Sequence, residues 1–196
     1  IDGMRALDAT VDYIRSKYPE IFLIADAKRG DIGNTAKMYA KAFFEEMDFD
    51  AVTIAPYMGA DSVTPFLEYK DKWAIVLALT SNASAYQFQN AQKDGKPLYQ
   101  AVMEEMMEIS TPDNMMFVVG ATKADKLQEL RSFCPDNFFL VPGVGAQGGS
   151  AEEVIANGSN DHGGLLINSS RGILFADSTE NYAKVAGEVA AKTANL

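Results

Sequence analysis

The sequence predicts an α/β fold in which parallel strands close into a TIM (β/α)8 barrel, with the first one or two strands absent from this chain. Six apolar runs with little polar alternation are typical of strands buried on both faces, and helical patterns separate most of them. Polar residues and glycines follow at least four of these runs, as they do where barrel strands end around one site. An open doubly wound sheet is the alternative, but it would spread those strand ends along a line.

The chain begins with an amphipathic helix, whose apolar residues recur at spacings of three and four until Pro19 ends it. No strand precedes this helix, so we expect residues upstream of Ile1 to be missing from the sequence. We expect strands at 21–28, 51–56, 73–80, 115–120, 137–142 and 163–168. We expect the remaining helices at 36–47, 60–70, 98–110, 123–133, 150–157 and 179–194.

Composition limits the class of protein. The 196 residues indicate one domain, 1–196, because no linker, low-complexity tract or repeat interrupts them. A net charge of −10 without a Lys/Arg-rich run argues against a nucleic-acid partner.

The longest apolar run, 73–79, is too short to cross a membrane, and no signal-peptide pattern is present. The single cysteine, Cys134, excludes an internal disulfide and favours a cytoplasmic protein. The single histidine, His162, argues against zinc and Ser–His chemistry.

The most informative segment is Asp26-Ala-Lys28-Arg-Gly-Asp31-Ile32-Gly-Asn-Thr35, at the end of the first predicted strand. Asp26 and Lys28 share one strand face because side chains alternate with period 2. An acid and an ammonium on the inward face of a buried strand are costly unless they pair or do chemistry. A salt bridge is the simple interpretation. Asp31, Ile32 and Thr35, at the entry to a helix, favour a functional one because they bring more polar groups to the same turn.

A phosphate site is predicted by two later segments. Pro142-Gly-Val-Gly-Ala-Gln147-Gly-Gly follows a strand and precedes a helix that should begin near Ser150. Glycines expose backbone N–H groups, the helix start adds positive potential, and Gln147 can donate a hydrogen bond. Arg171, after the last strand, matches the phosphate site that barrels build from the loops after strands 7 and 8. A plain flexible loop and a surface arginine are the simpler interpretations.

A third polar cluster, Thr80-Ser81-Asn82, ends the third predicted strand. The long connection that follows is typical of a lid or a binding loop. Ser81 and Asn82 could contact the edge of a polar heterocycle, and an ordinary turn is the alternative.

These motifs resemble those of the orotidine 5′-phosphate decarboxylase family, in its bacterial-type subgroup of longer chains. The resemblance runs from residue 1 to about 190 and is carried by the first motif, by Ala55-Pro-Tyr-Met-Gly-Ala-Asp-Ser62, by the glycine-rich loop and by Arg171. It implies an eight-stranded barrel, a homodimer with shared active sites, and no metal or organic cofactor. It also implies conversion of orotidine 5′-phosphate to uridine 5′-phosphate and CO2 in de novo pyrimidine synthesis.

The resemblance also implies a role for each site residue. Lys28 would protonate C6, and Asp26 would flank it and crowd the substrate carboxylate. Asp31, Ile32 and Thr35 would reach the partner subunit's site. The remaining predicted contacts are Ser81 to the pyrimidine, Gln147 and Arg171 to the phosphate, and Pro142 lining the site.

One departure concerns the start of the chain. The family pattern has a further aspartate and a further lysine on its first two strands, and this sequence begins after both. If the molecule itself began at Ile1, we would expect a broken barrel with negligible activity.

Three other functions stay open at this point. A related barrel enzyme could use Asp26 and Asp31 to hold Mg²⁺ and decarboxylate a sugar-phosphate acid. Lys28 could be the nucleophile of a Schiff-base aldolase, although neighbouring acids keep a lysine protonated. The chain could also bind a phosphate ligand without catalysis.

Overall fold

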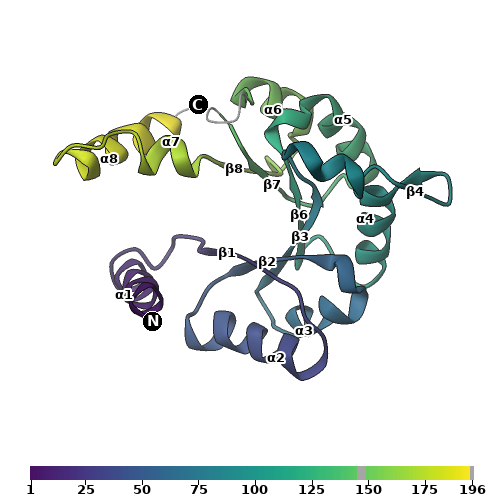
Figure 1. Cartoon of the computed structure of the whole chain (residues 1–196), viewed down its shortest axis with the longest axis horizontal. Coiled ribbons are helices and arrows are strands. Elements are labelled where there is room, and N and C mark those ends of the chain that lie inside the picture. Colours follow the sequence, from purple (N-terminus) through teal and green to yellow (C-terminus); the bar gives the residue numbers. More distant parts are fainter. Residues whose placement is uncertain (145–148, 195–196) are drawn as a thin grey trace. The chain divides into compact units, whose positions relative to one another are not determined.

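The computed structural model describes residues 1–144 and 149–194, which form two compact units. The first unit is Ile1–Leu77 with Gln100–Met116, and the second is Ala78–Tyr99 with Phe117–Leu196. The six long strands follow the order β1-β2-β3-β6-β7-β8, so each strand neighbours the next long strand along the chain (Figure 1). This order lacks the reversal that defines a doubly wound sheet, and it is the order found in a barrel.

The first unit contains α1 (Asp2–Lys17), β1 (Ile24–Arg29), α2 (Gly33–Lys41), the π-helical segment Ala42–Glu46, β2 (Ala51–Ile54), the 3-10 turns Pro56–Met58 and Ala60–Ser62, α3 (Thr64–Leu67), most of β3 (Trp73–Leu79) and of α4 (Leu98–Glu108), and the start of β6 (Met115–Val119). β1 pairs with β2, and β2 with β3, in parallel. Helices α2 and α3 lie side by side along these strands (Figure 1). The core between them contains fully buried side chains such as Ile54, Phe66 and Ile75.

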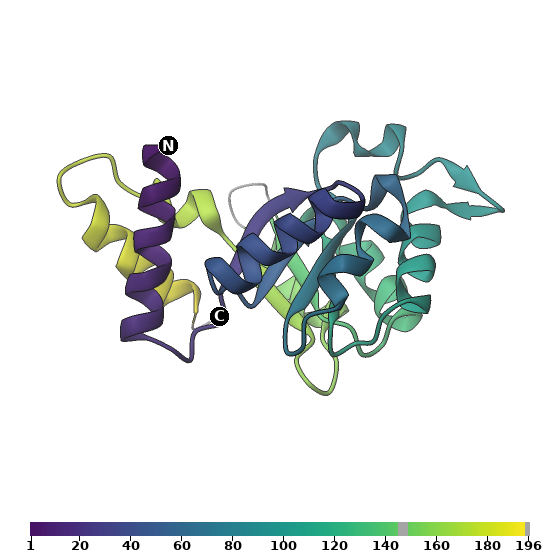
Figure 2. The same cartoon turned by 90° about the horizontal axis from the view of Figure 1, so that it is seen from below.

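The second unit contains the 3-10 turn Ala83–Gln87, β4 (Gln92–Lys93), β5 (Lys96–Pro97), the 3-10 turn Ala121–Lys123, α5 (Ala124–Phe133), β7 (Phe139–Pro142), α6 (Ala151–Gly158), β8 (Leu165–Asn168), α7 (Ser170–Leu174) and α8 (Tyr182–Thr193). β7 pairs in parallel with β6 and with β8. The hairpin β4–β5 projects from this unit (Figure 2), and its turn residues Asp94 and Gly95 both have positive φ, as a two-residue hairpin turn requires.

The six predicted strands are confirmed, with shorter bounds. β1 begins at Ile24 rather than residue 21, because the Leu23 N–H donates to the Asp50 carboxylate instead of a strand partner. The helix predicted over 60–70 is reduced to a 3-10 turn and the four-residue α3, in which Pro65 lies in the first turn. Neither α7 nor the β4–β5 hairpin was predicted from the sequence. No helix within 1–144 and 149–194 has the length and apolar character needed to span a bilayer.

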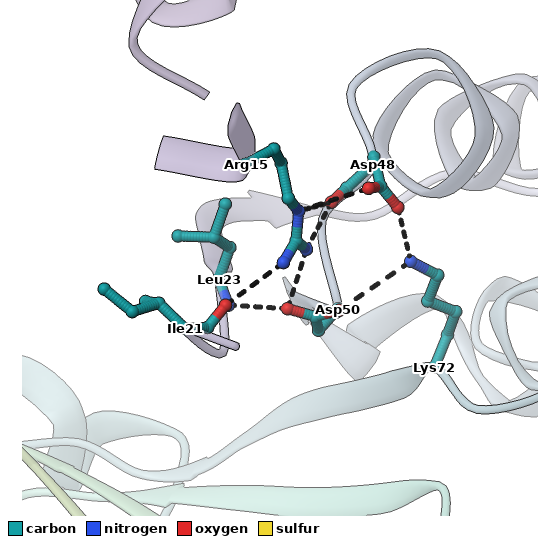
Figure 3. Close-up of polar contacts among 6 residues, drawn as sticks. All are labelled: Arg15, Ile21, Leu23, Asp48, Asp50 and Lys72. Atoms are coloured by element: carbon teal, nitrogen blue, oxygen red, sulfur yellow. Dashed lines mark hydrogen bonds and ion pairs between the residues drawn. The ribbon is translucent and has the colours of Figure 1, made fainter. Parts of the chain in front are cut away.

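A charged cluster ties the starts of three strands to α1 in the first unit (Figure 3). The Arg15 guanidinium donates to the Ile21 carbonyl at 3.1 Å and pairs with the Asp50 carboxylate at 2.8 Å. Lys72 pairs with Asp48 at 3.1 Å, and Asp50 accepts the Leu23 N–H at 2.7 Å. Because Asp50 satisfies both a cation and a backbone donor, it holds β1, β2 and α1 together at this end.

Arg131 has the equivalent role in the second unit. Its guanidinium donates to the carbonyls of Asn137 at 2.6 Å, Gly158 at 2.8 Å and Gly164 at 2.9 Å, and it stacks 4.1 Å from the centre of the Phe139 ring. One side chain on α5 therefore joins the end of α6 to the starts of β7 and β8. Gly164 leaves room for it, since a Cβ there would lie 2.8 Å from Arg131 Nη2.

Cys134 is buried beside this cluster and its Sγ lies 3.1 Å from the Leu130 carbonyl. Burial raises the pKa of the thiol to about 12. The thiolate is the reactive form, so the native protein keeps this cysteine unreactive at neutral pH.

We expect Asp50→Ala to lower the free energy of unfolding by about 2–3 kcal/mol, because the Leu23 N–H loses its acceptor and Arg15 loses one of its acceptors, the Asp50 carboxylate. Asp12→Ala, at an exposed position of α1, is the control and should change it by less than about 0.5 kcal/mol. Urea unfolding followed by circular dichroism measures both, and equal effects would contradict the proposed role of Asp50.

We expect a maleimide to label Cys134 at about pH 8 only after the protein is unfolded in urea. The folded pKa lies above the unfolded one, so folding favours the protonated thiol. This contribution to stability is present below about pH 9 and is lost as the pH rises toward about 12. Fast labelling of the native protein, followed by mass spectrometry, would show that the thiol is accessible.

Candidate active site

The Asp26–Lys28 pair lies at the carboxyl end of β1. Lys28 Nζ forms an ion pair with Asp26 Oδ1, so the predicted pairing is confirmed. The side chains are 63% exposed for Asp26 and 52% for Lys28. The predicted burial of this pair on an inward face is therefore wrong. Within its unit both side chains are exposed to solvent, so a ligand can reach them.

The expected regular alternation along β1 is also wrong. The pairing of β1 with β2 shifts between Ala25 and Arg29, and Lys28 adopts a left-handed φ of 47°. Such a bulge inserts extra backbone and re-aims the side chains that follow it. Lys28 meets Asp26 because of this irregular turn of the chain, supported by the neighbouring strand.

Thr53 on β2 supplies that support, and the sequence analysis missed it. Its Oγ1 accepts the Lys28 N–H at 2.9 Å and donates to Asp26 Oδ1 at 3.0 Å, and the residue is fully buried. The available signal was a hydroxyl inside the otherwise apolar strand Ala51–Ile54. A buried hydroxyl needs partners, and here the two shorter bonds go to the first motif, with a longer contact of 3.5 Å to the Ala25 carbonyl just before it.

Asp31, Ile32 and Thr35 lie at the entry to α2, as predicted. The Asp31 carboxylate accepts the Ile32 N–H at 2.8 Å, Ile32 precedes the first helical residue and is 51% exposed, and Thr35 is exposed in the first turn. Among the described residues of this chain, no ion pair joins Asp31 to Lys28. These three side chains are therefore available to contact a ligand or another chain.

Arg29 and Gly30 have structural roles that the motif analysis did not assign. The Arg29 guanidinium lies 5.1 Å from the Tyr39 ring centre and 5.5 Å from that of Phe43. Its carbonyl accepts the Ala55 N–H at 2.7 Å, and a Cβ on Gly30 would lie 3.0 Å from the Ala55 carbonyl oxygen. The two residues fix the loop after β1 against α2 and the end of β2.

In the second unit, Pro142 and Arg171 follow neighbouring strands. Pro142 ends β7 and pairs in register with Asn168, the last residue of β8. Ser169 Oγ donates to the Val144 carbonyl at 3.4 Å, which links the two loops. Gln147 lies outside the described residues. The Arg171 side chain is exposed on α7, and no ion pair or hydrogen bond engages it within the described part of the chain, so its charge is free for an anion.

The predicted helix start near Ser150 is confirmed, but its own side chains occupy it. Ser150 Oγ accepts the Glu153 N–H at 3.2 Å and donates to the Glu152 carboxylate at 2.7 Å. The hydrogen bond from Ser150 lowers the pKa of the Glu152 carboxyl. A carboxylate already lies at the positive end of α6, which leaves the glycine backbone and Arg171 as the stronger candidates for a phosphate.

Ser81 follows β3 beside the end of β6. A Cβ on Gly120 would lie 2.8 Å from both the Ser81 backbone nitrogen and its Cβ, so only glycine fits there. The neighbouring Thr80 is braced by Gln89, whose Oε1 accepts the Thr80 N–H at 2.9 Å and whose Nε2 donates to Thr80 Oγ1 at 2.8 Å. The loop after β3 is thus held at its start.

Titratable side chains form no candidate metal site in the part of the chain that the structure describes. In the described ranges, no group of three or more histidine, cysteine or acidic side chains is placed to hold a metal ion. His162 is exposed in the turn before β8, away from the carboxyl ends of the strands.

Comparison with known proteins gives consistent results. Residues 5–186 match the orotidine 5′-phosphate decarboxylase / HUMPS family. A protein of Christiangramia forsetii, named orotidine 5′-phosphate decarboxylase, is 55% identical over 187 residues, which are 95% of this chain and 69% of the relative. One of Phocaeicola vulgatus with the same name is 54% identical, over 98% of this chain and 71% of the relative.

A solved structure supports the same family and fold. The structure of Leishmania donovani OMP decarboxylase is 35% identical with a TM-score of 0.83, covering 98% of this chain and 74% of that chain. Together with the sequential strand order, this likeness confirms the predicted TIM barrel class, of which the described residues supply six parallel strands. The chain belongs to the orotidine 5′-phosphate decarboxylase / HUMPS family.

Proposed function

We propose that the protein converts orotidine 5′-phosphate to uridine 5′-phosphate and CO2, the last step of de novo pyrimidine synthesis. The observation that carries this proposal is the half-exposed Lys28 side chain, whose ammonium pairs with Asp26 at the carboxyl end of a strand in a chain of this family. Sites of barrel enzymes lie at that end of the strands. Relatives more than 50% identical are named for this activity.

The chemistry needs a fixed cation. Breaking the bond between C6 and the carboxylate releases CO2 and leaves the electron pair on C6. The Lys28 ammonium stabilises that charge as it develops and then gives a proton to C6, forming uridine 5′-phosphate. The resulting neutral amine regains a proton from solvent. Asp26 holds the ammonium in place and presents negative charge to the departing carboxylate, a crowding effect that we propose assists the reaction.

We propose that the domain 1–196 also binds the substrate at its pyrimidine ring and its phosphate. We assign the pyrimidine contact to Ser81, the phosphate contacts to Gln147 and Arg171, and part of the lining to Pro142. Arg171 suits a phosphate because its guanidinium is permanently charged and can bind two oxygens at once. Binding the distant phosphate supplies free energy that can be used at the reacting carbon.

We also propose a cytoplasmic homodimer with shared active sites. Asp31, Ile32 and Thr35 would enter the partner's site, since Ile32 and Thr35 are exposed, Asp31 is partly exposed, and among the described residues no ion pair joins Asp31 to Lys28 of its own chain. Tyr57 and Met58, in the loop after β2, are 88% and 47% exposed, which is unusual for large apolar side chains outside an interface.

The proposed reaction uses no metal or organic cofactor. EDTA should therefore leave turnover of orotidine 5′-phosphate unchanged, whereas loss of activity would favour the Mg²⁺-dependent decarboxylase. Borohydride trapping of a carbonyl substrate on Lys28 would favour the aldolase.

We expect Lys28→Ala to lower kcat for orotidine 5′-phosphate by about 100-fold or more, because the proton donor and the stabilising charge are both lost. Turnover is followed by the change in pyrimidine absorbance, using the protein as its gene encodes it. Lys37→Ala, at an exposed position of α2, is the control and should retain activity. A loss below about tenfold, which is about 1.4 kcal/mol of barrier, would be too small for the principal acid.

We expect Gly120→Ala to lower kcat/KM by about tenfold, because the new methyl group displaces Ser81 from the pyrimidine. Gly187→Ala, in α8 with no atom within 4 Å of the added Cβ, is the control. If both variants keep the kcat/KM of the unmodified protein, Ser81 has no role in substrate binding.

A further inference from the structure

We propose that Thr53 is the positioning residue of the active site, and that its hydroxyl fixes the Lys28 ammonium beside Asp26. This inference rests on the proposed function and deepens it. Thr53 lies on β2, whereas both residues that it contacts belong to β1.

The hydroxyl makes two bonds to the catalytic pair. It accepts the Lys28 N–H at 2.9 Å and donates its single proton toward Asp26 Oδ1 at 3.0 Å. Asp26 Oδ1 is also the oxygen that pairs with Lys28 Nζ. One buried oxygen therefore sets the backbone of the lysine and the orientation of its counterion.

The backbone of Lys28 needs such support. Its φ of 47° is a left-handed conformation that non-glycine residues rarely adopt, and the surrounding structure must hold it there. The strand pairing is irregular between Ala25 and Arg29, so the regular ladder of β1 and β2 does not hold it. Its N–H bonds to the Thr53 side chain instead.

Packing alone does not explain a threonine here. Val52 and Ile54 on either side are fully buried and apolar, and valine has nearly the same shape as threonine. A buried hydroxyl is costly unless it is hydrogen-bonded. Its shorter hydrogen bonds, 2.9 and 3.0 Å, are to Lys28 and Asp26, and a longer contact of 3.5 Å reaches the Ala25 carbonyl, so the position serves the site.

The test compares Thr53→Val, which removes the hydroxyl, with Thr53→Ser, which keeps it. Ile54→Val, one residue along the same strand and also fully buried, controls for a loss of core packing. Steady-state kinetics on orotidine 5′-phosphate give kcat and KM, and hydrogen exchange measured by NMR reports the Lys28 amide directly.

In Thr53→Val we expect kcat to fall by about 10- to 100-fold, because the ammonium loses its position relative to C6. KM should change by less than about threefold, since the phosphate contacts lie on other strands. Exchange of the Lys28 amide should accelerate. Thr53→Ser and Ile54→Val should stay within about threefold of the unmodified kcat.

Two results overturn the inference. One is a Thr53→Val protein with unchanged kcat, and the other is an equal loss in Thr53→Ser, which would assign the effect to packing. An unmodified protein that does not turn over orotidine 5′-phosphate overturns the proposed function instead. In that case an unchanged Lys28 exchange rate in Thr53→Val would also remove the assigned hydrogen bond.

Discussion

A lysine ammonium can stabilise a carbanion only if it stays charged and stays in place. Here the charge has its counterion two residues away on the same strand, and the place is defined by a hydroxyl on the next strand. The Lys28 side chain is half exposed, so the protein does not bear the full cost of burying a charge. In the proposed mechanism, the left-handed backbone at Lys28, the shifted pairing of β1 and the threonine in an apolar strand all serve this one requirement.

Stability and chemistry lie at opposite ends of the strands. Arg15, Asp50 and Lys72 bind the segments just before β1, β2 and β3, and Arg131 binds the carbonyls just before β7 and β8. The candidate catalytic and binding residues all follow the last residues of their strands or lie within three residues of them. Barrel enzymes divide their faces in this way, which lets the loops at one face vary while the other face holds the fold.

Strand positions were predictable because buried parallel strands are continuous apolar runs, and the site motifs were predictable because glycines and charges follow those runs. Three roles were not predictable: those of Thr53, Asp50 and Arg131. Each depends on contacts to residues distant in sequence or to backbone carbonyls, and such contacts produce no periodic pattern in the sequence. The bulge at Lys28 was missed for a related reason: alternation is a property of a regular strand, and the irregularity comes from the neighbouring strand. α7 is too short for a helical period to show.

The sequential strand order has a consequence for biosynthesis. During translation, β2 emerges when its partner β1 already exists, and β3 emerges next to a finished β2. The sheet can therefore grow in the direction of synthesis, one strand and helix at a time, without waiting for a distant segment. An edge strand left open on the ribosome is covered by the next long strand to appear, which shortens the time in which nascent chains could pair with one another.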